Sequence, residues 1–145
     1  MTLTESSIYI SLKRLRTLLF QSQFDMPKGY RIVYGTPIMQ NIGLALSSYV
    51  LAFTVTEQKV QYLESAIGYF SIVRTDLEFC VENNIIHFCK RRVEPKKDKQ
   101  GNELPIDARD EVNTTKIEIF KLIAKIDNDM CRWRASLAKG KTIRE

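Results

Sequence analysis

The residues whose types and spacing could do chemistry are mostly lysines and arginines, and the densest group lies in the second half of the chain. Six cations stand within ten residues there, offset only by Glu94 and Asp98: Lys90, Arg91, Arg92, Lys96, Lys97 and Lys99. Such a cluster can hold a phosphate backbone without reading bases, because Lys and Arg displace condensed counterions. The alternative is a solvated loop that its charge keeps soluble.

A second basic group is expected on a helix near the C-terminus. Its members are Lys121, Lys125, Arg132 and Arg134. The first three share roughly one helix face, while Arg132 and Arg134 flank Trp133, the only tryptophan. Trp133 also completes an apolar row, so core packing is its expected role. A net charge of +5 and a pI near 9.2 favour polyanion partners, and the two basic groups are therefore the predicted nucleic-acid-binding residues.

Catalytic and metal-ligating patterns are sparse. His87 is the only histidine and has no nucleophile at a recognisable spacing. The three cysteines, Cys80, Cys89 and Cys131, form no disulfide framework, and a pair eight residues apart around one histidine does not match a zinc site. No glycine-rich phosphate loop occurs. The sequence therefore predicts a binding protein that is not an enzyme and needs no metal or cofactor.

Four helical segments must position these residues, over residues 4–23, 37–55, 57–83 and 107–137. In the first, Ile8, Leu12, Leu15 and Leu19 recur at helical steps, and Thr4 or Ser6 can cap it. Residues 25–36 connect to the second, with 30–35 either a short strand or the start of that helix. Thr36 is its expected cap. All four segments fit one domain, with a mobile loop or hairpin over 89–109 and a frayed basic tail from 139.

The second segment is apolar on two sides. Its main face is formed by Ile38, Ile42, Ala45, Tyr49 and Ala52, and the other side carries Leu44, Leu51 and Val55. A helix of this kind packs against more than one neighbour. It is expected either at the centre of a bundle or in an interface between copies of the chain.

Arg74 stands out in the third segment because the spacing places it in an apolar row. The row is Val60, Leu63, Ile67, Phe70, Arg74, Leu77 and Val81. A cation there costs stability unless it is paired or the row opens to water. Arg74 therefore either pairs with a carboxylate such as Asp127 or Asp129, or lines a charged channel where an anion sits. The fourth segment has its own row: Ile119, Ile123, Ile126, Met130, Trp133 and Leu137.

Targeting signals are not apparent. Residues 8–20 are amphipathic and contain three cations, unlike the apolar region of a signal peptide. The most apolar run, residues 42–55, is too short to span a membrane. A cytoplasmic protein without a membrane partner is expected.

The order of these features resembles the accessory variability determinant family of diversity-generating retroelements, over residues 15–137. The resemblance rests on Met26-Pro27-Lys28 with Arg31 and Gly35 before an apolar helix, on the run 72–77 with its apolar-Arg-x-x-Leu pattern, and on the run 131–136 around Trp133. A related bundle family, encoded by intervening sequences in ribosomal RNA genes, usually ends its second helix with an Asn-Ile-Ala-Glu-Gly-like turn. Residues 53–57 do not match that turn.

The resemblance implies an antiparallel up-down four-helix bundle assembled into a homopentameric barrel. It also implies an accessory protein that binds the reverse transcriptase and its template RNA, or DNA, and supports mutagenic copying of a template repeat. The lysine-rich insert at 89–109 departs from the family, which leaves the surface for nucleic acid open.

Overall fold

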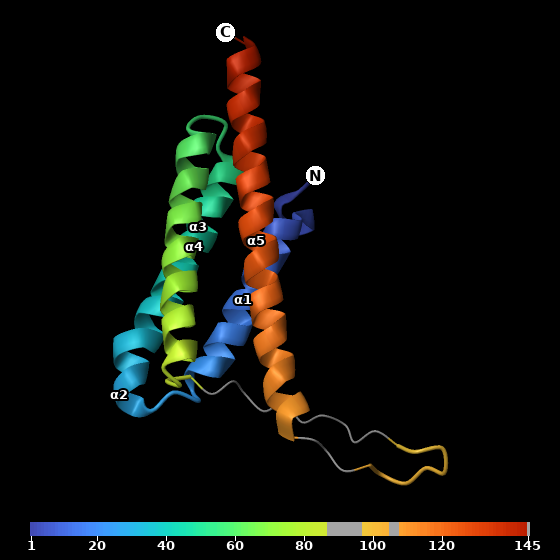
Figure 1. Ribbon diagram of the computed structural model, residues 1–145. Helices are drawn as coiled ribbons and strands as arrows, with labels where there is room; N and C mark the ends of the chain where they lie inside the picture. The colour runs from blue at the N-terminus through green and yellow to red at the C-terminus, as the bar shows by residue number, and fades with distance from the viewer. Residues whose placement is uncertain (87–96, 105–107, 145) are drawn as a thin grey trace.

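The computed structural model describes residues 1–86, 97–104 and 108–144, with side chains from 115 to 139 in the last stretch. Four long helices pack into a bundle: α1 (Ser7–Gln23), α3 (Thr36–Thr54), α4 (Lys59–Glu82) and α5 (Ala108–Arg144) (Figure 1). The predicted all-helical bundle is confirmed, and the described ranges contain no strand. His87, Cys89, Lys90, Arg91, Arg92 and Lys96 lie outside the described residues.

α1 begins after a short 3-10 turn, Leu3–Glu5. Ser6 is its N-cap, and the Ser6 hydroxyl accepts a hydrogen bond from the Tyr9 amide at 3.4 Å. This satisfies one of the amides that a helix leaves unpaired in its first turn. Of the two predicted caps, Ser6 rather than Thr4 caps the long helix.

The chain is helical from Lys28 to Thr54, so the strand alternative for 30–35 is wrong and the helical one is confirmed. A short helix, α2 (Lys28–Tyr30), passes into a π-helical turn, Arg31–Gly35, and then into α3. Thr36 is consequently not the N-cap of α3: it is the first residue of that helix, and its hydroxyl donates to the Arg31 carbonyl at 3.4 Å. The reason is that Pro27 is extended, with φ −54° and ψ 145°, and the helix starts directly after it.

Arg31 closes the connection between α1 and α3. Its Nη2 donates to the carbonyl of Phe24 at 3.0 Å and to that of Met26 at 3.3 Å. Gly35 is buried beside it, where a Cβ would meet Arg31 Cγ and Met26 Sδ at 3.4 Å. Arg31 therefore ties the start of α3 to the end of α1 through hydrogen bonds, and Gly35 allows the two segments to pack closely.

The core lies where α3 packs against α1 and α4, and α5 packs against α1 and α4. The predicted face of α3 is confirmed, because all five of its residues are buried. Leu44 and Leu51, on the other side of α3, are 45% and 41% exposed. The predicted row of α5 is also confirmed, with Trp133 and Leu137 half-buried and the other four residues buried.

The predicted row of α4 is partly wrong. Its buried residues are Leu63, Ala66, Phe70, Val73, Leu77 and Cys80. Val60, Ile67 and Val81 are only half-buried, and Arg74 lies at the edge of the packed face. The buried row uses the smaller Ala66, Val73 and Cys80, one residue before each predicted position, which brings α4 close to its neighbours.

α4 ends as predicted at the two asparagines, with Asn83 as C-cap and Asn84 in a left-handed conformation at φ 55°. α5 is helical to Arg144, beyond the predicted end near Leu137. Within the described residues, no helix combines the length and the apolar character that crossing a membrane requires.

Candidate nucleic-acid interface

Four cations form a single row along the outside of α5, here called the outer ridge: Lys121, Lys125, Arg132 and Lys139. At about 100° per residue these positions fall within about 40° of one another around the helix, and at 1.5 Å per residue the row is about 27 Å long. All four side chains are exposed. The prediction that Lys121, Lys125 and Arg132 share a face agrees with this geometry.

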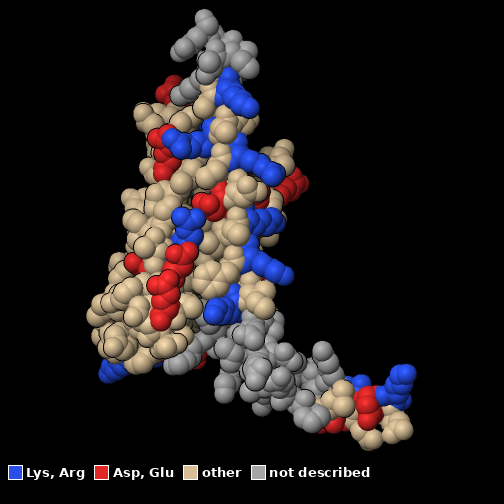
Figure 2. Space-filling view, in the orientation of Figure 1, with Lys and Arg blue, Asp and Glu red and all other residues tan. Residues whose placement is uncertain are grey.

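The outer ridge faces away from the core, because Ile119, Ile126 and Met130 lie on the opposite side of α5. Figure 2 shows a row of basic side chains along one edge of this helix. In the part of the chain with described side chains, no carboxylate forms an ion pair with any of the four. Their charge is therefore available to an external anion.

The ion-paired carboxylates of α5 contact neighbouring helices: Glu118 lies beside the ridge, and Asp127 lies on the side of α5 that faces α4. Ion pairs link α5 to the rest of the bundle: Arg14 with Glu118 at 2.9 Å, Arg74 with Asp127 at 3.3 Å, and Arg134 with Glu64 at 3.0 Å. Figure 2 shows acidic and basic side chains side by side on the face that α4 and α5 share. Glu118 and Asp127 are thus engaged with other helices, whereas Asp129, next to Lys125 on the pocket side of the ridge, forms no ion pair with a described side chain.

Arg74 pairs with Asp127, one of the two carboxylates expected for it. Its side chain is half-exposed, at the rim of the contact between α4 and α5. The structure therefore supports the paired alternative, and the seam position is corrected to an edge position.

The predicted basic residues are not all brought together. Arg134 lies on the side of α5 that faces α4, where Glu64 neutralises it. Lys97 and Lys99 lie in a separate tight turn over residues 97–104, which an antiparallel backbone β-bridge between Lys97 and Glu103 closes. Gly101 in this turn has φ +84°, which explains the turn signal read from its sequence.

A pocket of about 580 Å³ opens beside the outer ridge. It lies between the start of α1, the end of α3 and the middle of α5, and is here called the aromatic pocket. Its lining residues are Met1, Ser6, Ser7, Ile8, Tyr49, Phe53, Lys125, Asp129 and Trp133.

Three rings form the inner wall of the aromatic pocket. The Trp133 ring centroid lies 5.7 Å from that of Tyr49, edge to face, and 6.5 Å from that of Phe53. The Tyr49 hydroxyl hydrogen-bonds with the Ser6 hydroxyl. Burial raises the pKa of Tyr49, opposed by that hydrogen bond, so its hydroxyl stays protonated at neutral pH.

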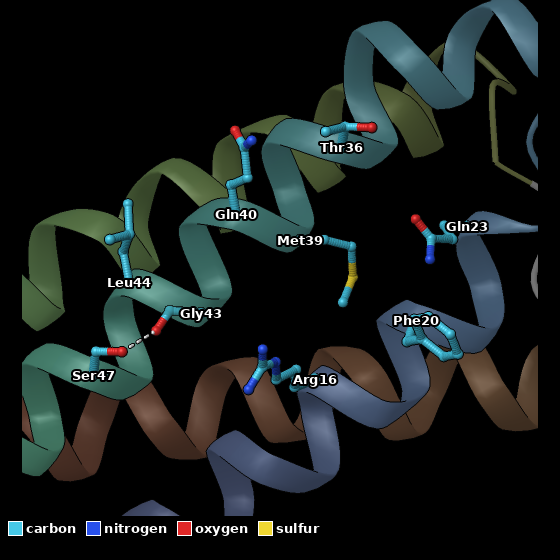
Figure 3. A pocket seen from close by; sticks show the side chains of 9 residues that line it. All are labelled: Arg16, Phe20, Gln23, Thr36, Met39, Gln40, Gly43, Leu44 and Ser47. Carbon is cyan, nitrogen blue, oxygen red and sulfur yellow. Dashed lines mark hydrogen bonds between the residues drawn. The ribbon is translucent and has the colours of Figure 1, made fainter.

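A second hollow, of about 700 Å³, is lined by residues of α1 and α3 on another side of the bundle. Figure 3 shows Arg16, Phe20 and Gln23 entering it from α1 and Met39 reaching in from α3. Arg16 is the one charged residue among those that line it. None of the residues that line this hollow belongs to the outer ridge.

Metal-binding geometry does not occur among the described residues, since no three His, Cys, Asp or Glu side chains gather there. Cys80 is buried, and burial followed by the nearby Asp76 charge raises its pKa to about 11. Cys131 is exposed. Neither thiol has a partner set for nucleophilic chemistry within these residues.

Lys139 and the aromatic pocket are not among the features predicted from the sequence. The signal for Lys139 was present, because Lys125, Arg132 and Lys139 recur every seven residues, but the residue fell in a predicted tail. The pocket had no local signal, since it joins three segments that are far apart in the sequence. Comparison with protein-family models, curated proteins and solved structures gives no match.

Proposed function

We propose that the protein is a nonenzymatic accessory protein that binds nucleic acid along the outer ridge of α5. The observation that carries the proposal is the row of four exposed cations along α5, about 27 Å long, none of which forms an ion pair with a described side chain. Such a row neutralises phosphates and releases their counterions. It holds a backbone without reading its sequence.

The partners in this proposal are the template RNA and the reverse transcriptase of a diversity-generating retroelement. The resemblance around Arg31, Gly35 and Trp133 supports them, as does the basic ridge. The same resemblance favours an up-down antiparallel arrangement and a cytoplasmic homopentamer. The protein's part is to hold the RNA near the enzyme during mutagenic copying.

Filter binding to a structured RNA at two salt concentrations tests the proposal. The ridge variant is Lys125→Gln with Arg132→Gln, and the matched control is Lys28→Gln with Arg134→Gln, one Lys and one Arg away from the ridge. The ridge variant should lower affinity and flatten the plot of log affinity against log salt by about 0.7–0.9 for each phosphate that is no longer neutralised. No affinity, affinity that ignores salt, or an equal loss in the control contradicts the proposal.

The basic cluster at 90–99 remains a second predicted binding surface. Replacing Lys90, Arg91 and Arg92 by Glu should weaken RNA binding further if the cluster neutralises phosphates beyond those on the ridge. Unchanged binding would assign the RNA to the helical surface alone.

A second candidate function is an oligomeric scaffold that binds protein partners only. Four large apolar side chains on the outside of the α3–α4 pair favour it: Leu44, Leu51, Ile72 and Phe79. Leu44 and Leu51 stand seven residues apart and so share one face of α3, as Ile72 and Phe79 share one face of α4, and exposed apolar faces often mark protein interfaces. Sedimentation at micromolar concentration shows whether a monomer persists, and the absence of nucleic-acid binding would favour this function over the first.

A further inference from the structure

We infer that the aromatic pocket takes one unpaired base of a single-stranded RNA whose backbone follows the outer ridge. The inference rests on the proposed function and adds the class of nucleic acid: a single strand rather than a duplex. It is carried by the shared position of Lys125, which belongs to the ridge and also lines the pocket.

The path from ridge to pocket follows one side of α5. Lys125, Asp129 and Trp133 are spaced four residues apart, so each is about 6 Å further along the helix and turned about 40° from the outer side toward the core. Lys125 is exposed, Asp129 is half-buried, and Trp133 is half-buried against Tyr49 and Phe53. A phosphate held by Lys125 therefore leaves its own base within reach of the pocket.

The lining of the pocket suits a base better than a phosphate. The half-buried rings of Trp133 and Phe53 offer stacking surface to any nucleobase, while Tyr49 is 2% exposed and supports Trp133 from behind. The Asp129 carboxylate repels a phosphate but accepts hydrogen bonds from base amino and imino groups. This distribution of charge keeps the backbone on the ridge and admits the base.

A duplex offers no free base to the pocket, because its bases are paired and stacked, and extracting one costs unstacking energy. Single-stranded segments offer bases that are already free to stack on aromatic side chains. The ridge alone would bind a single strand and a duplex through their phosphates with similar affinity. A higher affinity for the single strand would therefore indicate that a base occupies the pocket.

The tryptophan provides a direct test, because Trp133 is the only one in the chain. The full chain is titrated with a single-stranded RNA and with a blunt duplex of equal phosphate number, at low salt. Intrinsic fluorescence is recorded, and filter binding gives the affinity for each. We expect saturable quenching by the single strand, none by the duplex, and an affinity for the single strand about fivefold or more higher.

A variant that fills the pocket gives an independent readout. Ser7 is exposed at the pocket's rim, so Ser7→Phe adds a ring there without touching the core, and Ser65→Phe on α4 is the matched control. Ser7→Phe should remove the preference for the single strand and leave duplex affinity unchanged, while the control keeps both.

The outcomes separate the two proposals. Binding of both RNAs with equal affinity, without quenching or with equal quenching, overturns the pocket inference and leaves the ridge in place. A preference that survives Ser7→Phe also overturns it. If neither RNA binds, the proposed function itself is overturned. Quenching of Trp133 by an apolar peptide in that case assigns the pocket to a protein partner.

Discussion

Arg74 of α4 lies against Asp127 of α5, with Nη1 and Oδ2 3.3 Å apart and side chains 39% and 35% exposed. Seven residues further along α5, Arg134 pairs with Glu64 of α4. Positions seven apart share a helix face, so both pairs hold the same side of α5 against α4. They lie at the exposed edge of that contact, while the buried Ile119, Ile126 and Met130 fix the rotation that turns the outer ridge away from the bundle.

Replacing Arg74 by Met should lower the free energy of unfolding by no more than about 1 kcal/mol, because an ion pair this exposed is screened by water. Urea unfolding measures the change, and a double-mutant cycle with Asp127→Asn isolates the coupling. A loss of about 3–5 kcal/mol, the range for breaking a buried pair, would contradict the edge position of Arg74.

The alanine substitution of Gly68 should stabilise the protein. Gly68 is an exposed residue in the middle of α4, and a Cβ added there meets nothing within 4 Å. Ala is favoured over Gly inside a helix by about 0.8–1.0 kcal/mol. The matched change at Gly101 should add no stability, because φ is +84° there and a Cβ is strained. Thermal unfolding compares the two, and a gain at Gly101 equal to that at Gly68 would refute this explanation.

The helices could be predicted from the sequence because their apolar spacing is regular and their ends carry capping or breaking residues. The face of α3 was predicted in full. The face of α4 was not, since two adjacent rows are apolar there, and the choice between Ile67 and Ala66 depends on how closely the neighbouring helices approach. That information is tertiary and has no local signal.

The candidate site likewise has one part that the sequence indicates, the ridge, and one part that it does not, the aromatic pocket. The ridge follows from the periodicity of one helix, so most of it was predictable. The aromatic pocket brings Ser7, Phe53 and Trp133 together from three helices, and no spacing within a single segment can indicate that. Arg134 belongs to the predicted binding residues because it flanks Trp133, but its pairing with Glu64 places it on the side of α5 that faces α4.

The two described thiols should react at very different rates. Cys131 is exposed, whereas Cys80 is buried and its pKa is raised from 9.0 to about 11, first by burial and then by the Asp76 charge. In a Cys89→Ser variant at pH 8, a thiol reagent should label Cys131 quickly and Cys80 only after the protein unfolds. Burial favours the neutral thiol of Cys80, so its contribution to stability is present below pH 9 and is lost as the pH rises toward 11. Fast labelling of both thiols in the folded protein would contradict this.

Two residues on α3 distinguish core packing from an interface between copies. Ile42 is fully buried within the chain, and Ile42→Ala should cost about 2–5 kcal/mol at any protein concentration. Leu44 is 45% exposed, so Leu44→Ala should change the stability of a monomer by no more than about 0.5 kcal/mol. If copies associate through this side of α3, Leu44→Ala instead lowers the melting temperature in a concentration-dependent way and shifts sedimentation toward the monomer, because association stabilises the fold by mass action. A concentration-independent loss of several kcal/mol at Leu44 would contradict both interpretations of that surface.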